Sequence, residues 1–197
     1  MSHLACDSDK TSEYNKYQLS NFLEATSQYP KIKKSLAASG GIFLGQEYHF
    51  DLVRPGAAIY GIGSMLHPTL KNPVTLLAPV IQVKQLSKNE LVGYGTTAEL
   101  QSGSTIVTIP IGYGDGFFRF FSNNSTVHIN GKPAKVVGRV SMDLVTIDAS
   151  GHDVKVGDMV QIIGDHNTPD KIAESIGTIG YEIITSLNYG RFKRIYI

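Results

Sequence analysis

Apolar and polar positions in residues 1–60 alternate between two kinds of pattern. Three short apolar segments are typical of strands, namely "HLAC", "KSLAASGG" and "DLVRPGAAIYG". Residues 14–25 space their apolar side chains as an amphipathic helix does, and "IFLGQEYHF" is compatible with a second, short helix. This strand–helix–strand order is typical of βα units in a parallel sheet. Because three such strands do not complete a sheet with both faces covered, we expect residues 1–70 to form part of a larger βα assembly.

From about residue 76 the pattern changes to strands separated by turns. The strand-like segments are "LLAPVIQVKQL", "STIVTIPIG", "STVHI", "AKVVGRV", "DLVTIDAS" and "DMVQIIGD". The dipeptide Asn130-Gly131, which lies between two of them, is a strong signal for a hairpin turn. The phrase "VKVGDMVQIIG" resembles the turn-and-strand phrase of small β-barrels. We therefore expect residues 71–197 to be a mainly β domain.

The last thirty residues have helical spacing instead. Thr168 is a candidate N-cap, with Pro169 at the first helical position. The apolar side chains that follow are three or four residues apart, at Ile172, Ile176, Ile179, Ile183 and Leu187. Gly177 and Gly180 are expected to divide this stretch into two short helices.

Composition narrows the class of protein. The chain has 197 residues, of which 42% are hydrophobic and 18% charged, so it can bury a globular core. Its formal net charge is +1, and no basic field predicts a nucleic-acid partner. No apolar run approaches the roughly 18 residues of a membrane span, and the N-terminus has no signal-peptide pattern. The single cysteine cannot form an internal disulfide. We therefore expect a soluble, cytoplasmic protein with neither a nucleic-acid nor a membrane partner.

The first half of the chain contains a candidate anion site. The stretch Arg54-Pro55-Gly56-Ala57 places an arginine and bare backbone N–H groups at the end of one apolar segment. The preceding segment ends in small residues as well, with one hydroxyl at Ser39. Two such glycine-rich strand ends can cradle a phosphate, as they do in β/α barrels. A tight turn with a surface arginine is the alternative, because short glycine motifs often match by chance.

In the second half, Tyr113 stands between two glycines in "IPIGYGDGFFR". Glycine removes side-chain packing and lets the backbone adopt positive φ, so we expect an exposed phenol rather than a strand position. A phenol has a pKa near 10 and needs a cationic or hydrogen-bonding neighbour to act as a base. The residues alone also allow a turn or packing role for Tyr113.

Two further clusters carry weaker signals. In "GRVSMDLV", Met142 and Asp143 follow a Gly-Arg pair, and a lone aspartate there also fits a capped turn. Tyr189 stands beside a Gly-Arg pair near the C-terminus, where basic residues also suit a helix end. The six histidines lack the spacing of metal ligands, so no metal site is predicted.

The order of these phrases resembles bacterial alanine racemase, a family that depends on pyridoxal 5'-phosphate (PLP). The matching phrases are "HLACDSD", "SLAASGGI", "DLVRPGAAIYG", "VGYGTT", "PIGYGDGFFR", "VVGRVSMDLVTID" and "GYEIITSL". Each phrase is short, but their occurrence in this order along the chain is specific. The resemblance implies a fragment of a PLP-binding β/α (TIM) barrel in residues 1–70. Residues 71–197 would be the family's C-terminal β domain, which is similar to a β-barrel.

The resemblance also implies a cofactor site. In this family PLP forms a Schiff base with a lysine at the barrel mouth. Arg54 would hydrogen-bond the pyridine nitrogen, and because a guanidinium is not deprotonated it would keep that nitrogen unprotonated. Ser39 and the backbone of Gly56 and Ala57 would hold the phosphate, and Tyr189 would add its hydroxyl.

Racemisation needs one group to remove the α-proton from one face of the amino acid and another to return it on the opposite face. The resemblance implies that a lysine serves one face and Tyr113 the other. The family works as a head-to-tail homodimer, so Tyr113 would act in the partner subunit's site. Met142 and Asp143 would line the substrate entrance there.

The sequence departs from the family at two points. Ala38 stands where the family commonly has asparagine, before the phosphate-binding serine. No phrase matches the lysine–alanine–x–alanine–tyrosine–glycine motif of the first barrel strand. We therefore expect this chain to correspond to the C-terminal part of an alanine racemase and to be inactive alone. The intact dimer would interconvert L- and D-alanine for peptidoglycan. The alternatives are a broad-specificity PLP-dependent racemase and a non-enzymatic module for dimerisation or binding.

Overall fold

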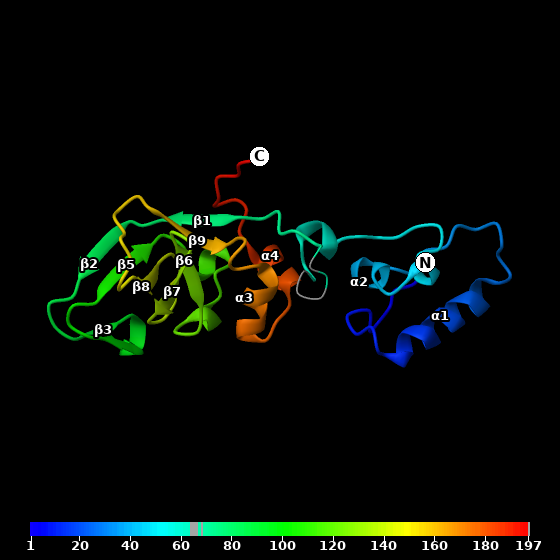
Figure 1. Cartoon of the computed structure of the whole chain (residues 1–197), viewed down its shortest axis with the longest axis horizontal. Helices are drawn as coiled ribbons and strands as arrows, with labels where there is room; N and C mark the ends of the chain where they lie inside the picture. The colour runs from blue at the N-terminus through cyan, green and yellow to red at the C-terminus, as the bar shows by residue number, and fades with distance from the viewer. Residues whose placement is uncertain (64–66, 68, 197) are drawn as a thin grey trace. The chain divides into compact units, whose positions relative to one another are not determined.

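The computed structural model describes residues 1–63, 67 and 69–196 and divides the chain into two compact units (Figure 1). The first unit runs from Met1 to Lys71 and the second from Asn72 to Ile197. No helix among the described residues is both long and apolar enough to cross a lipid bilayer.

The described part of the first unit contains four short helical elements, with extended segments between them. They are α1 (Glu13–Thr26), α2 (Ser39–Ile42) and the 3₁₀ turns η1 (Gln46–Tyr48) and η2 (Ala57–Tyr60). The helix expected at residues 14–25 is thus confirmed as α1. A small apolar core forms where α1 packs on the extended segments, from Leu4, Phe22, Leu36, Ala37 and Tyr48.

The three strands expected in this unit do not form as such. Only one isolated parallel bridge, between Ala38 and Arg54, is present in the described part of the unit. The extended segments still run side by side, because Ser2 N donates to Ser35 O and Arg54 N donates to Ala37 O, both at 3.0 Å. A ladder needs repeated pairing along both chains, and these segments make only single bonds. The expectation of strands was therefore wrong, although the order in which the segments adjoin is that of a βα unit.

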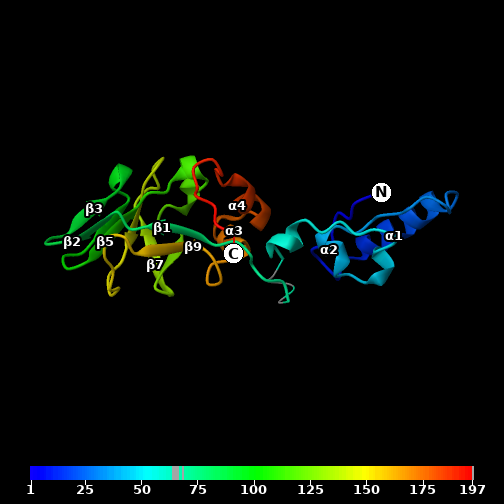
Figure 2. The ribbon, with the colours of Figure 1, turned by 90° about the horizontal axis from the view of Figure 1, so that it is seen from above.

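The second unit contains a seven-stranded antiparallel sheet in the order β1-β9-β6-β7-β8-β5-β2. Figure 2 shows its strands β1, β2, β5, β7 and β9 from above. Its strands are β1 (Leu76–Pro79), β2 (Gln82–Gln85), β5 (Thr105–Ile109), β6 (Thr126–Ile129), β7 (Lys132–Val137), β8 (Val145–Asp148) and β9 (Met159–Ile163). Six of the seven fall within the segments that the alternating pattern predicts, and β7 begins at Lys132, two residues before its predicted segment. Asn130 and Gly131 both adopt positive φ, at 50° and 75°, in the turn between β6 and β7, so the predicted hairpin is confirmed.

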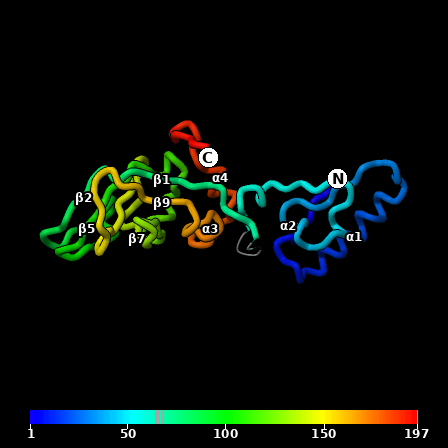
Figure 3. The backbone as a smooth tube through the Cα atoms, turned by 45° about the horizontal axis from the view of Figure 1, so that its top comes forward, coloured from blue at the N-terminus to red at the C-terminus, as the bar shows by residue number. Residues whose placement is uncertain are grey.

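The two end strands of this sheet are consecutive in the chain, which curls the sheet towards a barrel. Only Val80 and Ile81 separate β1 from β2. Val80 N donates to Asp158 O at 2.8 Å, beside β9, and Ile81 N donates to Thr108 O at 2.9 Å in β5. The chain therefore steps from one end of the sheet to the other within two residues, as the tube in Figure 3 traces. This curled, mainly β architecture confirms the expected fold class.

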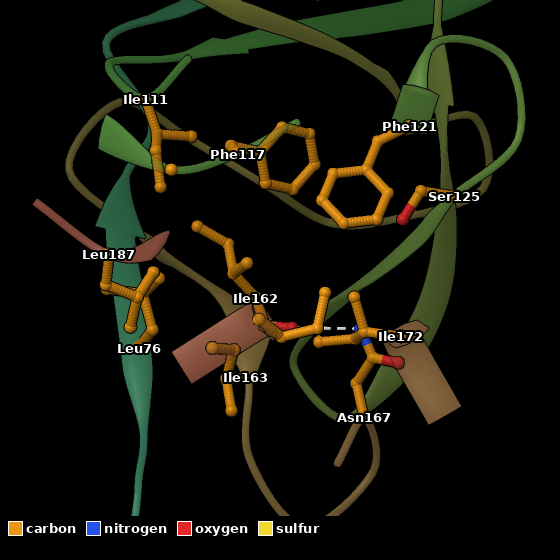
Figure 4. A pocket seen from close by; sticks show the side chains of 12 residues that line it. Leu76, Ile111, Phe117, Phe121, Ser125, Ile162, Ile163, Asn167, Ile172 and Leu187 are labelled. Carbon is orange, nitrogen blue, oxygen red and sulfur yellow. Dashed lines mark hydrogen bonds between the residues drawn. The ribbon is translucent and has the colours of Figure 1, made fainter. Parts of the chain in front are cut away.

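Helices α3 (Pro169–Ile176) and α4 (Gly180–Ser186) cover one end of the curled sheet. Thr168 caps α3 by accepting from Lys171 N, and Gly177 ends it with a φ of 73°, so both predicted signals are confirmed. Gly180 begins α4 rather than interrupting a helix. Apolar side chains from the sheet and both helices meet beneath this end, as Figure 4 shows for Ile111, Phe117, Ile162, Ile172 and Leu187. The space left between them, about 10 Å³, is too small for a ligand, so this region is core.

One element of the second unit was not expected. Strands β3 (Glu90–Val92) and β4 (Ala98–Leu100) form a separate two-stranded sheet around the 3₁₀ turn η3 (Tyr94–Thr96). Each strand is only three residues long, below the length at which alternation is informative.

Candidate functional site

The Tyr113 loop, residues 112–116, leaves the end of β5 and is held against the Met142 loop, residues 141–144. Tyr113 N donates to Ser141 O at 3.0 Å, and Gly114 N donates to Met142 O at 2.9 Å. The phenol itself is 51% exposed. These bonds fix the backbone while leaving the side chain accessible.

Gly112 differs from the sequence-based expectation. Its φ is −160°, which is extended backbone, so positive φ is not the reason for glycine at this position. A Cβ at Gly112 would instead overlap the carbonyl oxygens of Ser141 and Met142. Glycine is therefore needed for close approach of the two loops. Positive φ occurs further on, at Gly116, where φ is 96°.

A cavity of about 670 Å³ opens where these two loops meet the β3–β4 hairpin. It is lined by Tyr94, Tyr113, Arg119, Arg139, Val140, Ser141, Met142, Asp143 and Leu144. The structure thus brings together three residues that the sequence singles out: Tyr113, Met142 and Asp143. A volume of this size lies in the range of small-molecule sites.

Tyr94 is a second phenol in this cavity that the sequence reasoning did not single out. It lies in η3 between Gly93 and Gly95, whose φ angles are 77° and 71°, and it is 73% exposed. The guanidinium of Arg139 lies against the same turn, because a Cβ at Gly95 would be 3.5 Å from Arg139 Cζ. The signal was present in the sequence: the tripeptide Gly-Tyr-Gly occurs at residues 93–95 and again at residues 112–114.

Some of the charged side chains around the cavity form ion pairs and others do not. Arg191 Nη2 donates to Asp143 Oδ1 at 2.7 Å, and Arg191 Nε lies 3.1 Å from Asp115 Oδ1. The hydrogen bond that Arg191 donates to Asp143 and the nearby charge of Asp115 raise the pKa of Arg191. Within the described residues, Arg119 and Arg139 are not engaged in any ion pair. The cavity therefore presents two unpaired cations, whereas its one lining carboxylate is neutralised.

In the first unit, Ser39 lies where the anion cradle is expected. Its Oγ accepts from Gly56 N at 2.8 Å and from Ala58 N at 3.2 Å, and the side chain is buried. Two backbone N–H groups thus converge on one oxygen, and Ala57 lies between them in sequence. A phosphate oxygen is an acceptor of the same kind. This donor set fits a phosphate group.

Arg54 is held by several acceptors in the same unit. Its Nη1 donates to the buried Ser35 Oγ, and its Nη2 donates to Ser2 O at 2.7 Å and to Leu36 O at 3.3 Å. His3 Nδ1 lies 3.4 Å from the same Nη2. A guanidinium with its orientation fixed in this way can donate to a neutral ring nitrogen, which fits the pyridine of PLP.

Tyr189 lies in the second unit, just after α4. Its hydroxyl donates to Ile184 O at 2.9 Å, and its side chain is about half exposed. The hydroxyl therefore has a partner within its own unit. A role in phosphate binding stays a prediction.

The chain matches two family models. Residues 73–196 match the model described as "Alanine racemase, C-terminal domain", and residues 1–64 match "Alanine racemase, N-terminal domain". A curated alanine racemase of Rickettsia akari is 51% identical over the whole chain, and that of Rickettsia typhi is 41% identical. The chain spans only about half the length of these relatives, 55% and 60% respectively.

Solved structures agree with these matches. An alanine racemase of Bartonella henselae with covalently bound pyridoxal phosphate superposes with a TM-score of 0.92 at 44% identity, over 99% of this chain and 55% of that one. The biosynthetic alanine racemase of Pseudomonas aeruginosa gives a TM-score of 0.88 at 31% identity, over 98% of this chain and 55% of that one.

Proposed function

The chain belongs to the alanine racemase family, and we propose that it supplies part of the site at which such an enzyme interconverts L- and D-alanine. The observation that carries the proposal is the cavity of about 670 Å³, in which two phenols, two unpaired arginines and the Met142 loop converge. The product D-alanine would serve peptidoglycan synthesis. The assembled enzyme would be a head-to-tail homodimer in which this cavity completes the partner subunit's site.

The first unit would contribute to binding PLP. When bound, PLP supplies an electron sink that makes the α-proton of an amino acid acidic. Ser39 and the N–H groups of Gly56 and Ala57 would hold its phosphate; the bonds from Gly56 N and Ala58 N to Ser39 Oγ bring this turn and the serine together. Arg54 would donate to the ring nitrogen and, because it keeps its own proton, leave that nitrogen unprotonated.

Two phenols compete for the role of the base that serves one face of the substrate. The family resemblance favours Tyr113, which sits on a backbone fixed by the Met142 loop. Tyr94 is the more exposed phenol and lines the same cavity, in a turn against which the Arg139 guanidinium lies. We infer that Tyr113 removes or returns the proton and that Tyr94 lines the cavity beside it.

The other lining residues would receive the amino acid. The carboxylate of alanine is anionic, and Arg119 and Arg139 give this cavity its positive charge. Met142 would limit the width of the entrance, since its side chain lines the same cavity. Asp143 would stay paired with Arg191 and so would not repel the substrate.

No lysine of this sequence matches the family's PLP-binding phrase, so we expect the chain alone to have no racemase activity. The test is to express the chain with and without the part of the Rickettsia akari relative that it does not cover, in a D-alanine auxotroph and as purified protein. Growth and racemisation should require both parts. Activity of the chain alone would overturn the expected inactivity, and no activity with both parts would overturn the proposed function.

The same assembly tests the base. In deuterated water, NMR reports loss of the α-proton from L-alanine and from D-alanine separately. We expect Tyr113→Phe to slow loss from one enantiomer by about 10²–10⁴-fold and Tyr94→Phe to have the smaller effect. The reverse order would assign the base to Tyr94, and no selective loss in either variant would exclude a tyrosine base.

The alternatives are separated by the same material. A panel of amino acids would distinguish a broad-specificity racemase, which would process several of them at comparable rates. A non-enzymatic module would give a stable dimer without racemisation in either combination.

A further inference from the structure

We propose that Arg191 is a positioning residue that clamps the Tyr113 loop to the Met142 loop. The inference rests on the proposed function only in that these two loops line the proposed substrate cavity. Arg191 is not among the residues that line this cavity, so its effect on substrate would be exerted through the loops.

The clamp has one arm on each loop. Arg191 Nε contacts Asp115 Oδ1 at 3.1 Å, and Arg191 Nη2 donates to Asp143 Oδ1 at 2.7 Å. The other carboxylate oxygen of Asp115 accepts from Gly112 N at 2.9 Å. One guanidinium therefore connects the backbone on one side of Tyr113 with the residue that follows Met142.

The two arms differ in strength because the two carboxylates differ in burial. Asp115 is only 5% exposed, whereas Asp143 is exposed. Exposed ion pairs contribute little, but removing the partner of a buried carboxylate leaves an uncompensated charge. The ion pair with Asp115 therefore contributes most of the stabilisation of the clamp, and the ion pair with Asp143 orients the guanidinium.

The surrounding backbone is arranged to admit this guanidinium. A Cβ at Gly114 would lie 2.6 Å from Arg191 Nη1, so glycine leaves the space that the side chain occupies. Asn188 binds the same loop, with its N donating to Asp115 O at 3.0 Å and its Nδ2 to Gly114 O at 3.2 Å. Arg191 N donates to Asn188 O at 2.9 Å. The segment after α4 is thus attached to the Tyr113 loop at Asn188 as well as at Arg191.

The clamp also has an electrostatic consequence for the cavity. With Arg191 in place, Asp115 and Asp143 are both next to a cation, and the unpaired charges facing an incoming carboxylate are those of Arg119 and Arg139. Without it, Asp143 would face an anionic substrate unpaired. In an assembled racemase we therefore expect Arg191→Gln to raise KM more than it lowers kcat.

The closing experiment does not depend on racemase activity. Amide hydrogen exchange is measured by NMR on the 197-residue chain and on Arg191→Gln, with β5 and β8 amides reporting global stability. We expect the amides of Gly112 and Gly114 to exchange about tenfold faster in the variant, while the β5 and β8 amides change by less than about twofold. Arg194→Gln is the matched control, since Arg194 has no ion pair or side-chain hydrogen bond with any of the residues that the structure describes, and it should leave all of these rates unchanged.

Two further variants keep the inference falsifiable. Asp143→Asn removes only the exposed arm and should accelerate exchange at Gly112 and Gly114 by less than about threefold. Arg191→Lys keeps the charge but lacks the planar fork and should give an intermediate rate. Unchanged exchange in Arg191→Gln would overturn the inference, as would an equal acceleration in the loop and in β5 and β8. Neither result would bear on whether the family activity is present.

Discussion

Replacing Gly112 by alanine should strongly destabilise the second unit, although the substitution is only one methyl group. Gly112 is buried, and its extended backbone, with a φ of −160°, accommodates alanine without strain. The new Cβ, however, would lie well inside the 3.0 Å that real Cβ atoms keep, against the carbonyl oxygens of Ser141 and Met142. Both contacts are backbone atoms, so no side-chain rotation relieves them.

The magnitude follows from what must move. A shift of roughly 0.5 Å between the loops would lengthen the bonds from Tyr113 N and Gly114 N to about 3.5 Å, where hydrogen bonds are weak. Each lost bond costs about 1 kcal/mol, and overpacking adds about 1–3 kcal/mol. The lower entropy of an unfolded chain with alanine offsets about 0.4–1 kcal/mol of this. The expected net loss is about 2–4 kcal/mol in the free energy of unfolding.

The assay is urea unfolding followed through the NMR signals of β5 and β8, which report the second unit by itself. With an m-value of about 2 kcal/mol/M, the midpoint should fall by about 1–2 M at unchanged m. Gly190→Ala is the control, since a Cβ there meets only Asn188 Oδ1 at 3.5 Å, and its midpoint should hardly move. A midpoint for Gly112→Ala equal to that of Gly190→Ala would refute the argument from close approach.

Three further predictions concern other parts of the chain. Burial lowers the pKa of His128, and the charges of His166 and Lys171 lower it further. In the unfolded chain this histidine has a pKa of about 6.5, so as the pH falls below that value the unfolded chain binds more protons than the folded one. The free energy of unfolding should therefore decrease by at most about 1.4 kcal/mol per pH unit between about pH 7.5 and about pH 5.5. In His128→Gln the urea midpoint should depend less on pH over this range. Thr168→Ala removes the N-cap of α3 and should cost about 0.5–1 kcal/mol by the same assay, with Thr168→Ser close to the parent. Ser39→Ala should weaken binding of inorganic phosphate about tenfold in a ³¹P NMR titration, and equal affinity would argue against the cradle.

Local chemistry explains which parts of the fold could be predicted from the sequence. Thr168 before Pro169, and Asn130 before Gly131, act through bonds within a few residues, so both signals predicted their elements correctly. Pairing between distant segments is not encoded locally. The apolar segments around Ala38 and Arg54 have a strand-like pattern, yet among the described residues of this unit they share only one bridge.

Only part of the candidate site was predicted from the sequence, again because local patterns do not show which distant segments meet. Tyr113 and Met142 belong to recognisable phrases, and the structure brings them into one cavity. Tyr94 was overlooked because it lies between two strands too short to give an alternating pattern. The reason for glycine at position 112 could not be inferred from the sequence either, because this glycine is required by the close approach of a loop about thirty residues away in the chain. What sequence reasoning missed is thus tertiary proximity, not residue chemistry.

The pairing of β1 with β9 has a consequence for how this protein is made. Pro79 pairs with Met159, so this pairing joins segments whose emergence from the ribosome is separated by the synthesis of the intervening strands. At a translation rate of roughly 5–20 residues per second, several seconds pass between the synthesis of β1 and that of β9. During that interval its backbone groups are unpaired and open to other chains. Slow translation near the start of this unit, or a chaperone that holds β1, should therefore affect the yield of folded protein more than the same intervention near α3.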